Sequence, residues 1–355
     1  MKPRAIAVTG LNATDNPGPG VSVLRALRAA PELAVRTVGL AYDALEPGVY
    51  AKDLVDDVFM IPYPKEGLEA LSERIRYIHE RVGGLAAIIP TLDAELPSYI
   101  TLEPMLTELG IGTFMPSRAQ FELRSKAHLI ELGRQAGITV PQARILGDVA
   151  PLYDIHREMP FPLVIKGLYY GATIARAVDD AVQAFQRSVA AWGLPVIAQE
   201  FVEGDEYDVV AVGDGEGGLV GAVSMRKTYL TDKGKGWAGI AVKDPHLLEM
   251  TERFMSASKW RGPCEIEVMK ARDGRYYLME INPRFPAWTF LSAGAGMNLP
   301  EAVARLAMGE KVAPMRDFQA GTMFVRIAID QIATLEDLQT ITTAGERTRG
   351  EESER

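Results

Sequence analysis

Short apolar, β-rich runs alternate with helical segments over the first third of the chain. The β-rich runs read AIAVTGL (5–11), RTVGLAY (36–42), DVFMIPY (57–63) and AAIIPTL (86–92). Amphipathic stretches such as GLEALSERIRYIHERVG (67–83) separate them. Strands that alternate with helices predict a parallel sheet. We therefore expect residues 1–115 to form a Rossmann-like α/β lobe.

Two strand-exit loops of this lobe are rich in polar groups. They run from Asn12 to Gly20 and from Thr91 to Glu95. Ligands of open α/β sheets bind beyond the carboxyl ends of the strands, so each loop is a candidate for substrate contact. Each could equally be a plain connector. The glycines of the first loop do not have the spacing of a dinucleotide fingerprint.

The remaining pattern predicts two further lobes of mixed α and β structure. Residues 116–202 begin with an amphipathic helix that Gly137 ends. Residues 203–320 hold two strands around a Gly-rich turn, then a hairpin and a last helix. We expect residues 321–355 to form a C-terminal strand and a disordered tail, because few apolar residues follow Thr342.

The hairpin, residues 264–285, carries the most informative polar pattern. Side chains two apart share one face of a strand, so Glu265 and Glu267 point the same way, as do Glu280 and Asn282 on the returning strand. Mg²⁺ takes hard oxygen ligands and bridges carboxylates to nucleotide phosphates. We therefore predict that Glu267, Glu280 and Asn282 form a metal site. The alternative is a solvent-facing hairpin, which the apolar strand YYLMEIN disfavours.

We expect lysine side chains to bind any nucleotide phosphates. No Walker sequence occurs, and two G-x-G-x-x-G matches do not open a helix in a βαβ unit. Lys166 follows the apolar run Pro162 to Ile165 into a loop, and the alternative is an ordinary strand-end lysine. Lys126 is the second candidate, although Ser125 could simply cap an ordinary helix there.

Composition narrows the function classes. The chain has 355 residues, 47% of them hydrophobic and 24% charged, which is ordinary globular usage and predicts more than one core. A net charge of -9 argues against a nucleic-acid surface. Cys264 is the only cysteine, the four histidines are scattered, and no run of eighteen apolar residues occurs. We expect a cytoplasmic enzyme with no membrane or nucleic-acid partner.

The acidic strand, the E-x-N of Glu280 and Asn282 and the following Arg284 resemble the ATP-grasp superfamily over about residues 110–312. The resemblance implies a two-lobed ATP-grasp fold after the Rossmann-like lobe. It also places Lys126 and Lys166 on the nucleotide phosphates, and the segment VIAQEFVEGDEYDV at the interdomain hinge. The remaining nucleotide contacts that it implies are Glu200, Phe201 and Val202 around adenine and Glu206 on the ribose. The loop after Lys166 departs from the Gly-rich or Ser-rich lid of many members.

The implied reaction is attack of a carboxylate on the γ-phosphate of ATP, followed by capture of the acyl phosphate by an amine. ATP and Mg²⁺, or Mn²⁺, would be the cofactors. Arg284 would bind the carboxylate and the oxyanion, and Arg226 and Lys227 are candidates for an anionic substrate or the γ-phosphate. Two alternatives stay open, a bicarbonate- or carbamate-phosphorylating enzyme like carbamoyl phosphate synthetase and a non-catalytic nucleotide-binding regulator. The expected partners are a small-molecule carboxylate and an amine, with a homodimer as an open arrangement.

Overall fold

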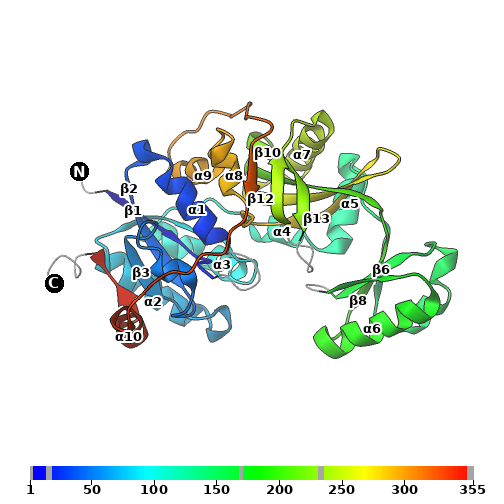
Figure 1. The fold of residues 1–355 in the computed structure, drawn as a ribbon, viewed down its shortest axis with the longest axis horizontal. Coiled ribbons are helices and arrows are strands. Elements are labelled where there is room, and N and C mark those ends of the chain that lie inside the picture. The colour runs from blue at the N-terminus through cyan, green and yellow to red at the C-terminus, as the bar shows by residue number, and fades with distance from the viewer. Residues whose placement is uncertain (1–2, 13–17, 168–170, 231–235, 350–355) are drawn as a thin grey trace.

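The computed structural model describes residues 3–12, 18–167, 171–230 and 236–349, without the side chains of Lys126 and Ala127. Within these residues the chain forms three sheets (Figure 1). One is largely parallel and two are antiparallel. This mixture confirms the predicted combination of α/β and α+β architecture.

The first lobe is a sheet with helices on both faces. Its elements are β1 (Arg4–Val8), α1 (Pro19–Arg28), β2 (Val35–Ala41), β3 (Asp57–Met60), α2 (Leu68–Arg81), β4 (Leu85–Ile89), α3 (Leu96–Glu108) and, from the C-terminal part, β15 (Glu346–Arg347). The order is β15-β3-β2-β1-β4, with β1 to β4 parallel and β15 antiparallel to β3. Leu24 of α1 packs on one face, and Ile75 of α2 and Tyr99 of α3 on the other. The predicted parallel sheet is therefore present.

The middle lobe is a small sheet backed by one helix. Its elements are β5 (Ala143–Leu146), β6 (Leu163–Gly167), β7 (Ala172–Ala175), α6 (Val178–Trp192) and β8 (Val196–Glu200). The order is β5-β8-β6-β7, and all neighbours are antiparallel. Ile165 and Ala198 pack with Ala184 and Phe185 of α6 in a core of their own. Figure 1 shows this lobe set apart from the rest of the molecule.

The third lobe is a long antiparallel sheet. Its elements are α4 (Arg118–Glu122), α5 (Lys126–Ala136), β9 (Gly204–Asp214), β10 (Leu219–Leu230), β11 (Gly236–Ala241), α7 (Pro245–Ser258), β12 (Arg261–Ala271), β13 (Tyr276–Asn282), α8 (Phe290–Gly294), α9 (Leu299–Ala307) and β14 (Met323–Val325). The strand order is β13-β12-β9-β10-β11-β14. α5 packs here, where Leu132 meets Phe254 of α7, and not on the middle-lobe sheet. The helix that the sequence assigned to the second lobe thus contributes to the third.

The first and third lobes share a hydrophobic core. Val8 and Leu24 of the first lobe lie in one cluster with Val212 and Met225 of the long sheet and Val303 of α9. Burial of apolar surface stabilises this arrangement by about 25 cal/mol per Å². The first lobe is therefore fixed against one face of the long sheet, whereas the middle lobe has a separate core.

The C-terminal segment returns to the first lobe. α10 (Leu335–Ala344) leads into β15, and Glu346 and Arg347 are only 6% and 7% exposed. Arg74 of α2 donates through Nη2 to the Gly345 carbonyl at 2.7 Å. The expectation of a disordered tail after Thr342 is therefore wrong for the described residues up to 349. Pairing with the edge of β3 orders the segment despite its polar composition.

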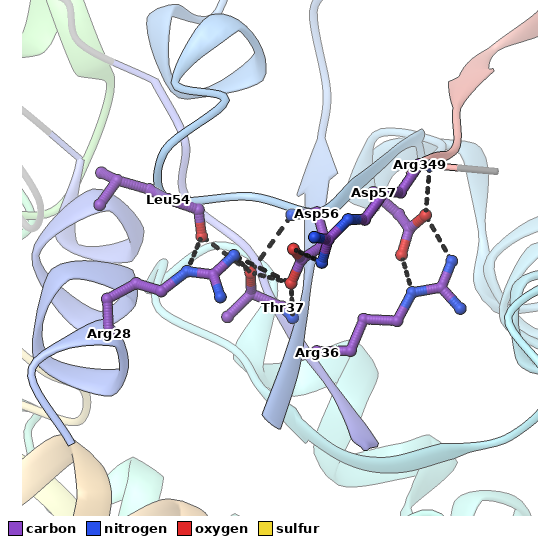
Figure 2. Close-up of polar contacts among 7 residues, drawn as sticks. All are labelled: Arg28, Arg36, Thr37, Leu54, Asp56, Asp57 and Arg349. Carbon is purple, nitrogen blue, oxygen red and sulfur yellow. Dashed lines mark hydrogen bonds and ion pairs between the residues drawn. The ribbon is translucent and has the colours of Figure 1, made fainter. Parts of the chain in front are cut away.

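Hydrogen bonds and ion pairs hold the C-terminal segment beside β3 (Figure 2). The Arg349 backbone N–H donates to Asp57 Oδ1 at 3.0 Å, and its Nη1 donates to Asp56 Oδ1 at 3.1 Å. Arg36 Nη2 lies 2.6 Å from Asp57 Oδ1, and Arg28 Nη2 lies 2.9 Å from Asp56 Oδ2. Asp57 is fully buried, and a buried carboxylate needs such partners.

Candidate active site

Carboxylates from three neighbouring strands share one face of the long sheet. In the register of β12 and β13, Glu265 lies opposite Asn282 and Glu267 lies opposite Glu280. Asp208 of β9 lies opposite Glu267 on the other side. Directly opposed residues of antiparallel strands project to the same face. The structure therefore brings together the four hairpin residues that the sequence pattern selected. It adds Asp208, which that pattern did not select.

Glu265 is the centre of a hydrogen-bond network. Asn282 Nδ2 donates to Glu265 Oε2 at 3.0 Å and to Glu267 Oε1 at 2.9 Å. Trp288 Nε1 donates to Glu265 Oε1 at 2.7 Å, and Arg284 Nη1 donates to its Oε2 at 2.9 Å. Both oxygens of Glu265 are thus occupied, and the residue is 7% exposed. Glu265 therefore anchors its neighbours, while Glu267 is only half-buried and Glu280 is exposed.

Arg284 joins the long sheet to the first lobe. Its Nε donates to Asp93 Oδ2 at 3.1 Å, and Asp93 also pairs with Arg124 Nη1 at 3.2 Å. Burial alone would lower the pKa of Arg284, but Asp93 and Glu265 outweigh it and raise that pKa above the ordinary value. The guanidinium is therefore a fixed cation at the junction of the two lobes.

The loop from Thr91 to Glu95 holds Asp93 in this position. Glu95 is 1% exposed, and its Oε1 accepts the backbone N–H groups of Thr91 and Leu92, each at 2.8 Å. Burial raises the pKa of Glu95, while hydrogen bonds from Thr9 and Tyr42 oppose that rise. The loop that the sequence could not separate from a plain connector thus reaches the predicted site.

Lys227 lies on the carboxylate face of the same sheet. Its Nζ is 3.0 Å from Glu206 Oε2 and 3.2 Å from Asp208 Oδ1, and its side chain is 10% exposed. Burial raises the pKa of Asp208 well above the ordinary value; Lys227 opposes the rise, and Glu265 and Glu267 add to it. The face therefore carries more negative charge than Lys227 neutralises. The ribose contact predicted for Glu206 must compete with this ion pair.

The side chain of Arg226 points to the opposite face of β10 from that of Lys227. It pairs with Asp205 at 3.1 Å, and both side chains are about half exposed, 48% and 55%. Adjacent strand residues project to opposite faces. The structure therefore brings Lys227 to the carboxylates and leaves Arg226 on the other side of the sheet.

One face of the middle-lobe sheet carries the candidate nucleotide contacts. Val164 lies opposite Gln199 and Lys166 lies opposite Ile197, on the face away from α6. Lys166 is half-buried. Gln199 is 2% exposed, and within the described part of the chain its Oε1 has no hydrogen-bond partner. A buried unpaired carbonyl oxygen is costly, so Gln199 is a binding candidate that the sequence did not single out.

Three of the other predicted nucleotide residues follow Gln199 directly in the chain. Glu200 Oε2 accepts the Gln142 backbone N–H at 3.1 Å, Phe201 is half-buried and Val202 is 8% exposed. Lys126 is the first residue of α5, and its side chain lies outside the described residues. Residues 168–170, the centre of the expected lid, also lie outside them.

Arg326, just after β14, is a further cation, and no sequence motif singled it out. Its backbone N–H donates to the Trp237 carbonyl at 2.9 Å, while its buried Nη1 has no hydrogen-bond partner among the described residues. Burial lowers the pKa of Arg326 to about 10, and the charge of Glu265 partly offsets this. The β14–β11–β10 register places Phe324 and Lys227 on one face through Gly239, and Arg326 follows Phe324 by two residues. Arg326 is therefore an incompletely paired cation on the carboxylate face.

The sequence and the fold of this chain both match known proteins. A family model described as "ATP-grasp in the biosynthetic pathway with Ter operon" matches residues 194–328, which include the segment predicted as the hinge, the carboxylates and Arg326. The biotin carboxylase of Campylobacter jejuni, solved as a β,γ-ATP complex, superposes with a TM-score of 0.71 over 90% of this chain and 74% of that one, at 17% identity. The chain has the ATP-grasp fold, and residues 194–328 match an ATP-grasp family model. The resemblance inferred from the hairpin is thereby confirmed.

The curated relatives that this chain matches are longer than the matched regions. The carbamoyl phosphate synthase large chain of Gemmatimonas aurantiaca is 28% identical over 198 residues, which are 51% of this chain and 18% of that protein. A D-alanine–D-alanine ligase from Ectopseudomonas mendocina is 27% identical over 189 residues, 49% of this chain and 58% of the ligase. The matches thus span less than two thirds of either relative.

The carboxylate face of the ATP-grasp domain suits a hard divalent cation. Among the described residues no group of three His, Cys, Asp or Glu side chains is arranged to hold a metal. The predicted set instead combines two carboxylates, Glu267 and Glu280, with the amide oxygen of Asn282, on a face where burial, together with Glu265 and Glu267, raises the pKa of Asp208. Mg²⁺ needs only one or two protein carboxylates when phosphates complete its shell. No helix in the described part of the chain has the length and apolar character to cross a membrane.

Proposed function

We propose that this ATP-grasp protein is an ATP-dependent ligase that joins a carboxylate to an amine. A carboxylate oxygen attacks the γ-phosphorus of ATP, and the bond from phosphorus to the β–γ bridging oxygen breaks to release ADP. The amine nitrogen then attacks the acyl carbon of the acyl phosphate. The carbon–oxygen bond to phosphate breaks, phosphate leaves and the nitrogen loses a proton. The similarity to a D-alanine–D-alanine ligase supports this reaction class.

The buried Nη1 of Arg326, which no described residue hydrogen-bonds, is the observation that carries the proposal. An underpaired cation close enough to Glu265 to feel its charge fits an anionic substrate group. Arg284 also donates to Glu265, and its hydrogen bond to Asp93 fixes its orientation. It can therefore present a preorganised donor to a developing oxyanion. We assign binding of the substrate carboxylate to these two guanidinium groups.

Nucleotide binding falls to the middle lobe in this proposal. Lys166 would contact the phosphates, with Lys126, while the unpaired Oε1 of Gln199 would accept the exocyclic amine of adenine. Phe201 and Val202 would line the base, next to Glu200. Glu267, Glu280 and Asn282 would hold Mg²⁺ or Mn²⁺, which neutralises charge on phosphate oxygens when bound.

An ADP-release assay tests the reaction class. Purified protein with ATP and Mg²⁺ is offered amino acids and small carboxylates, alone and in pairs, and bicarbonate separately. We expect ADP to appear with one carboxylate and to rise when an amine is added, with an amide product detected by mass. ADP release on bicarbonate alone would replace the proposal by the alternative that similarity to carbamoyl phosphate synthase supports. ATP binding without ADP release on any substrate would indicate the regulator.

Two substitutions distinguish residues that bind the adenine base from residues that bind the phosphates. Lys166→Ala should weaken ATP binding by roughly 10- to 100-fold, because a charged hydrogen bond contributes about 1.5–3 kcal/mol, and should leave adenosine binding unchanged. Gln199→Leu should weaken ATP and adenosine alike by roughly 3- to 10-fold, the effect of a neutral hydrogen bond. Isothermal titration with adenosine and a non-hydrolysable ATP analogue measures both.

Gln339→Leu, an exposed amide on α10, is the matched control and should bind both ligands normally. Equal losses of ATP and adenosine in Lys166→Ala would remove that lysine from the phosphate site. Normal adenosine affinity in Gln199→Leu would remove the amide from the base pocket.

A further inference from the structure

Glu265 accepts hydrogen bonds from three side chains that lie on or just after β13. Asn282 Nδ2 and Arg284 Nη1 both donate to its Oε2, at 3.0 and 2.9 Å, and Trp288 Nε1 donates to its Oε1 at 2.7 Å. An ionised carboxylate can only accept, through about four lone-pair sites, and these donors use most of them. Glu265 is also only 7% exposed. It is therefore poorly placed to bind a metal directly, although it shares a strand face with Glu267.

The acids of β12 determine which end of the Asn282 amide faces them. Asn282 Nδ2 lies 3.0 Å from Glu265 Oε2 and 2.9 Å from Glu267 Oε1. A side-chain amide has an NH2 donor end and a carbonyl acceptor end, so the NH2 end is the one that satisfies two carboxylates. The oxygen Oδ1 is consequently turned away from both acids. Because Mg²⁺ takes oxygen ligands, this orientation is the one in which Asn282 can serve as a metal ligand.

One oxygen of Glu265 links the two predicted roles of the site. Its Oε2 holds Asn282, a predicted metal ligand, and Arg284, the predicted oxyanion donor. Arg284 is fixed on its other side by Asp93, whose Oδ2 accepts from Nε at 3.1 Å. Trp288 fixes the carboxylate itself through Oε1. A change in the position of Glu265 would therefore move both Asn282 and Arg284.

We propose that Glu265 is a positioning residue, which holds the Asn282 amide with its oxygen available to the metal and fixes the guanidinium of Arg284. The proposal rests on the proposed function, because it takes Glu267, Glu280 and Asn282 as the metal set. Hydrogen-bond partners that orient metal ligands typically contribute roughly 10- to 100-fold to metal affinity or activity. The role requires an acceptor at this position, and it does not require Glu265 to touch the metal or the substrate.

Titration with Mn²⁺ tests this role in Glu265→Gln. The substitution keeps nearly the same volume, but its NH2 group must face at least one of the donors, Asn282, Arg284 or Trp288. We expect Mn²⁺ to bind roughly 10- to 100-fold more weakly to the variant than to the wild type, each saturated with a non-hydrolysable ATP analogue. The electron paramagnetic resonance signal of free Mn²⁺ measures this. Without metal the analogue should bind both proteins equally, because its predicted contacts do not include Glu265.

Glu103→Gln is the matched control, because Glu103 of α3 also joins the first lobe to β12. It is half-buried, and its Oε1 accepts from Thr113 Oγ1 at 2.7 Å and from Arg261 Nη1 at 2.8 Å. Both variants should lose thermal stability, but Glu103→Gln should bind Mn²⁺ as the wild type does. Normal Mn²⁺ binding by a folded Glu265→Gln chain, or equal weakening in both variants, would overturn the proposal.

A second background shows whether Glu265 acts through Asn282. In Asn282→Ala, the added Glu265→Gln substitution should change Mn²⁺ affinity by less than about threefold, because the ligand that Glu265 positions is gone. A further loss of about tenfold would make Glu265 a ligand itself and contradict the positioning role. Glu280→Gln identifies failure of the proposed function instead. If that variant binds Mn²⁺ normally, the metal set is wrong and the inference falls with it.

Hydrogen exchange in the wild-type chain covers the case in which Glu265→Gln does not fold. Selective ¹⁵N labelling of asparagine gives four side-chain NH2 signals, from Asn12, Asn16, Asn282 and Asn298. Asn282→Ser assigns the signal of Asn282. We expect its Nδ2 protons to exchange with water more slowly than those of free asparagine, because both acids hold them. Exchange at the rate of free asparagine would show that the acids do not hold the amide, and the proposal would then be wrong.

Discussion

Glu280→Gln is expected to reduce substrate-dependent ADP release by more than tenfold while the chain remains folded. The substitution removes one ligand charge from the predicted metal set and preserves nearly the same volume. A tenfold change in rate corresponds to about 1.4 kcal/mol, a modest loss for a metal ligand that faces triphosphate. A coupled ADP assay over a range of Mg²⁺ concentrations, with thermal unfolding alongside, measures both quantities.

The matched control is Glu216→Gln, which changes an exposed acid in the turn between β9 and β10. Its turnover and Mg²⁺ requirement should equal those of the wild type. If Glu280→Gln kept more than about a tenth of the wild-type rate, Glu280 would be removed from the metal set. The metal would then have to be held by Glu267 and Asn282 with water.

Arg284→Lys should lower product formation by roughly 100-fold or more and leave ATP binding intact. Lysine keeps the positive charge near Asp93 and Glu265 but loses the planar fork that reaches both. Removal of one oxyanion donor typically costs this much in rate. Titration with a non-hydrolysable ATP analogue, beside the coupled ADP assay, separates binding from chemistry.

Arg226→Lys is the control on the opposite face of the sheet, where its exposed pair with Asp205 contributes little. It should leave both measurements unchanged. The opposite result for Arg284→Lys, weak nucleotide binding with normal turnover of bound ATP, would make Arg284 a phosphate ligand. The substrate carboxylate would then fall to Arg326 and Lys227.

The features that were predicted most accurately from the sequence are those that local sequence patterns determine. Period two and the Asp273–Gly274 turn were enough to pair β12 with β13 and to bring Glu267 and Glu280 face to face. The parallel first sheet likewise followed from alternating strands and helices. Both depend on residues close together in the chain.

What the sequence missed depends on distant partners. Asp208 and Lys227 meet across two strands, and nothing in MRKTYL showed which of Arg226 and Lys227 would face the acids. Gln199 and Arg326 were found because burial leaves their polar atoms unpaired, a property that exists only after folding. The ordered residues after Thr342 were missed because their partner strand, β3, lies almost 290 positions earlier.

The return of β15 to β3 has a consequence for the order of folding during synthesis. Although the first lobe is translated first, its sheet keeps an open edge at β3 until residues 346–347 leave the ribosome. Its core also waits for Val212 and Val303, which belong to the shared cluster. The middle lobe needs only residues 143–200, which are contiguous and have a core of their own. Contiguous contacts close early in a growing chain, so the middle lobe is expected to fold on the ribosome before the lobe that precedes it.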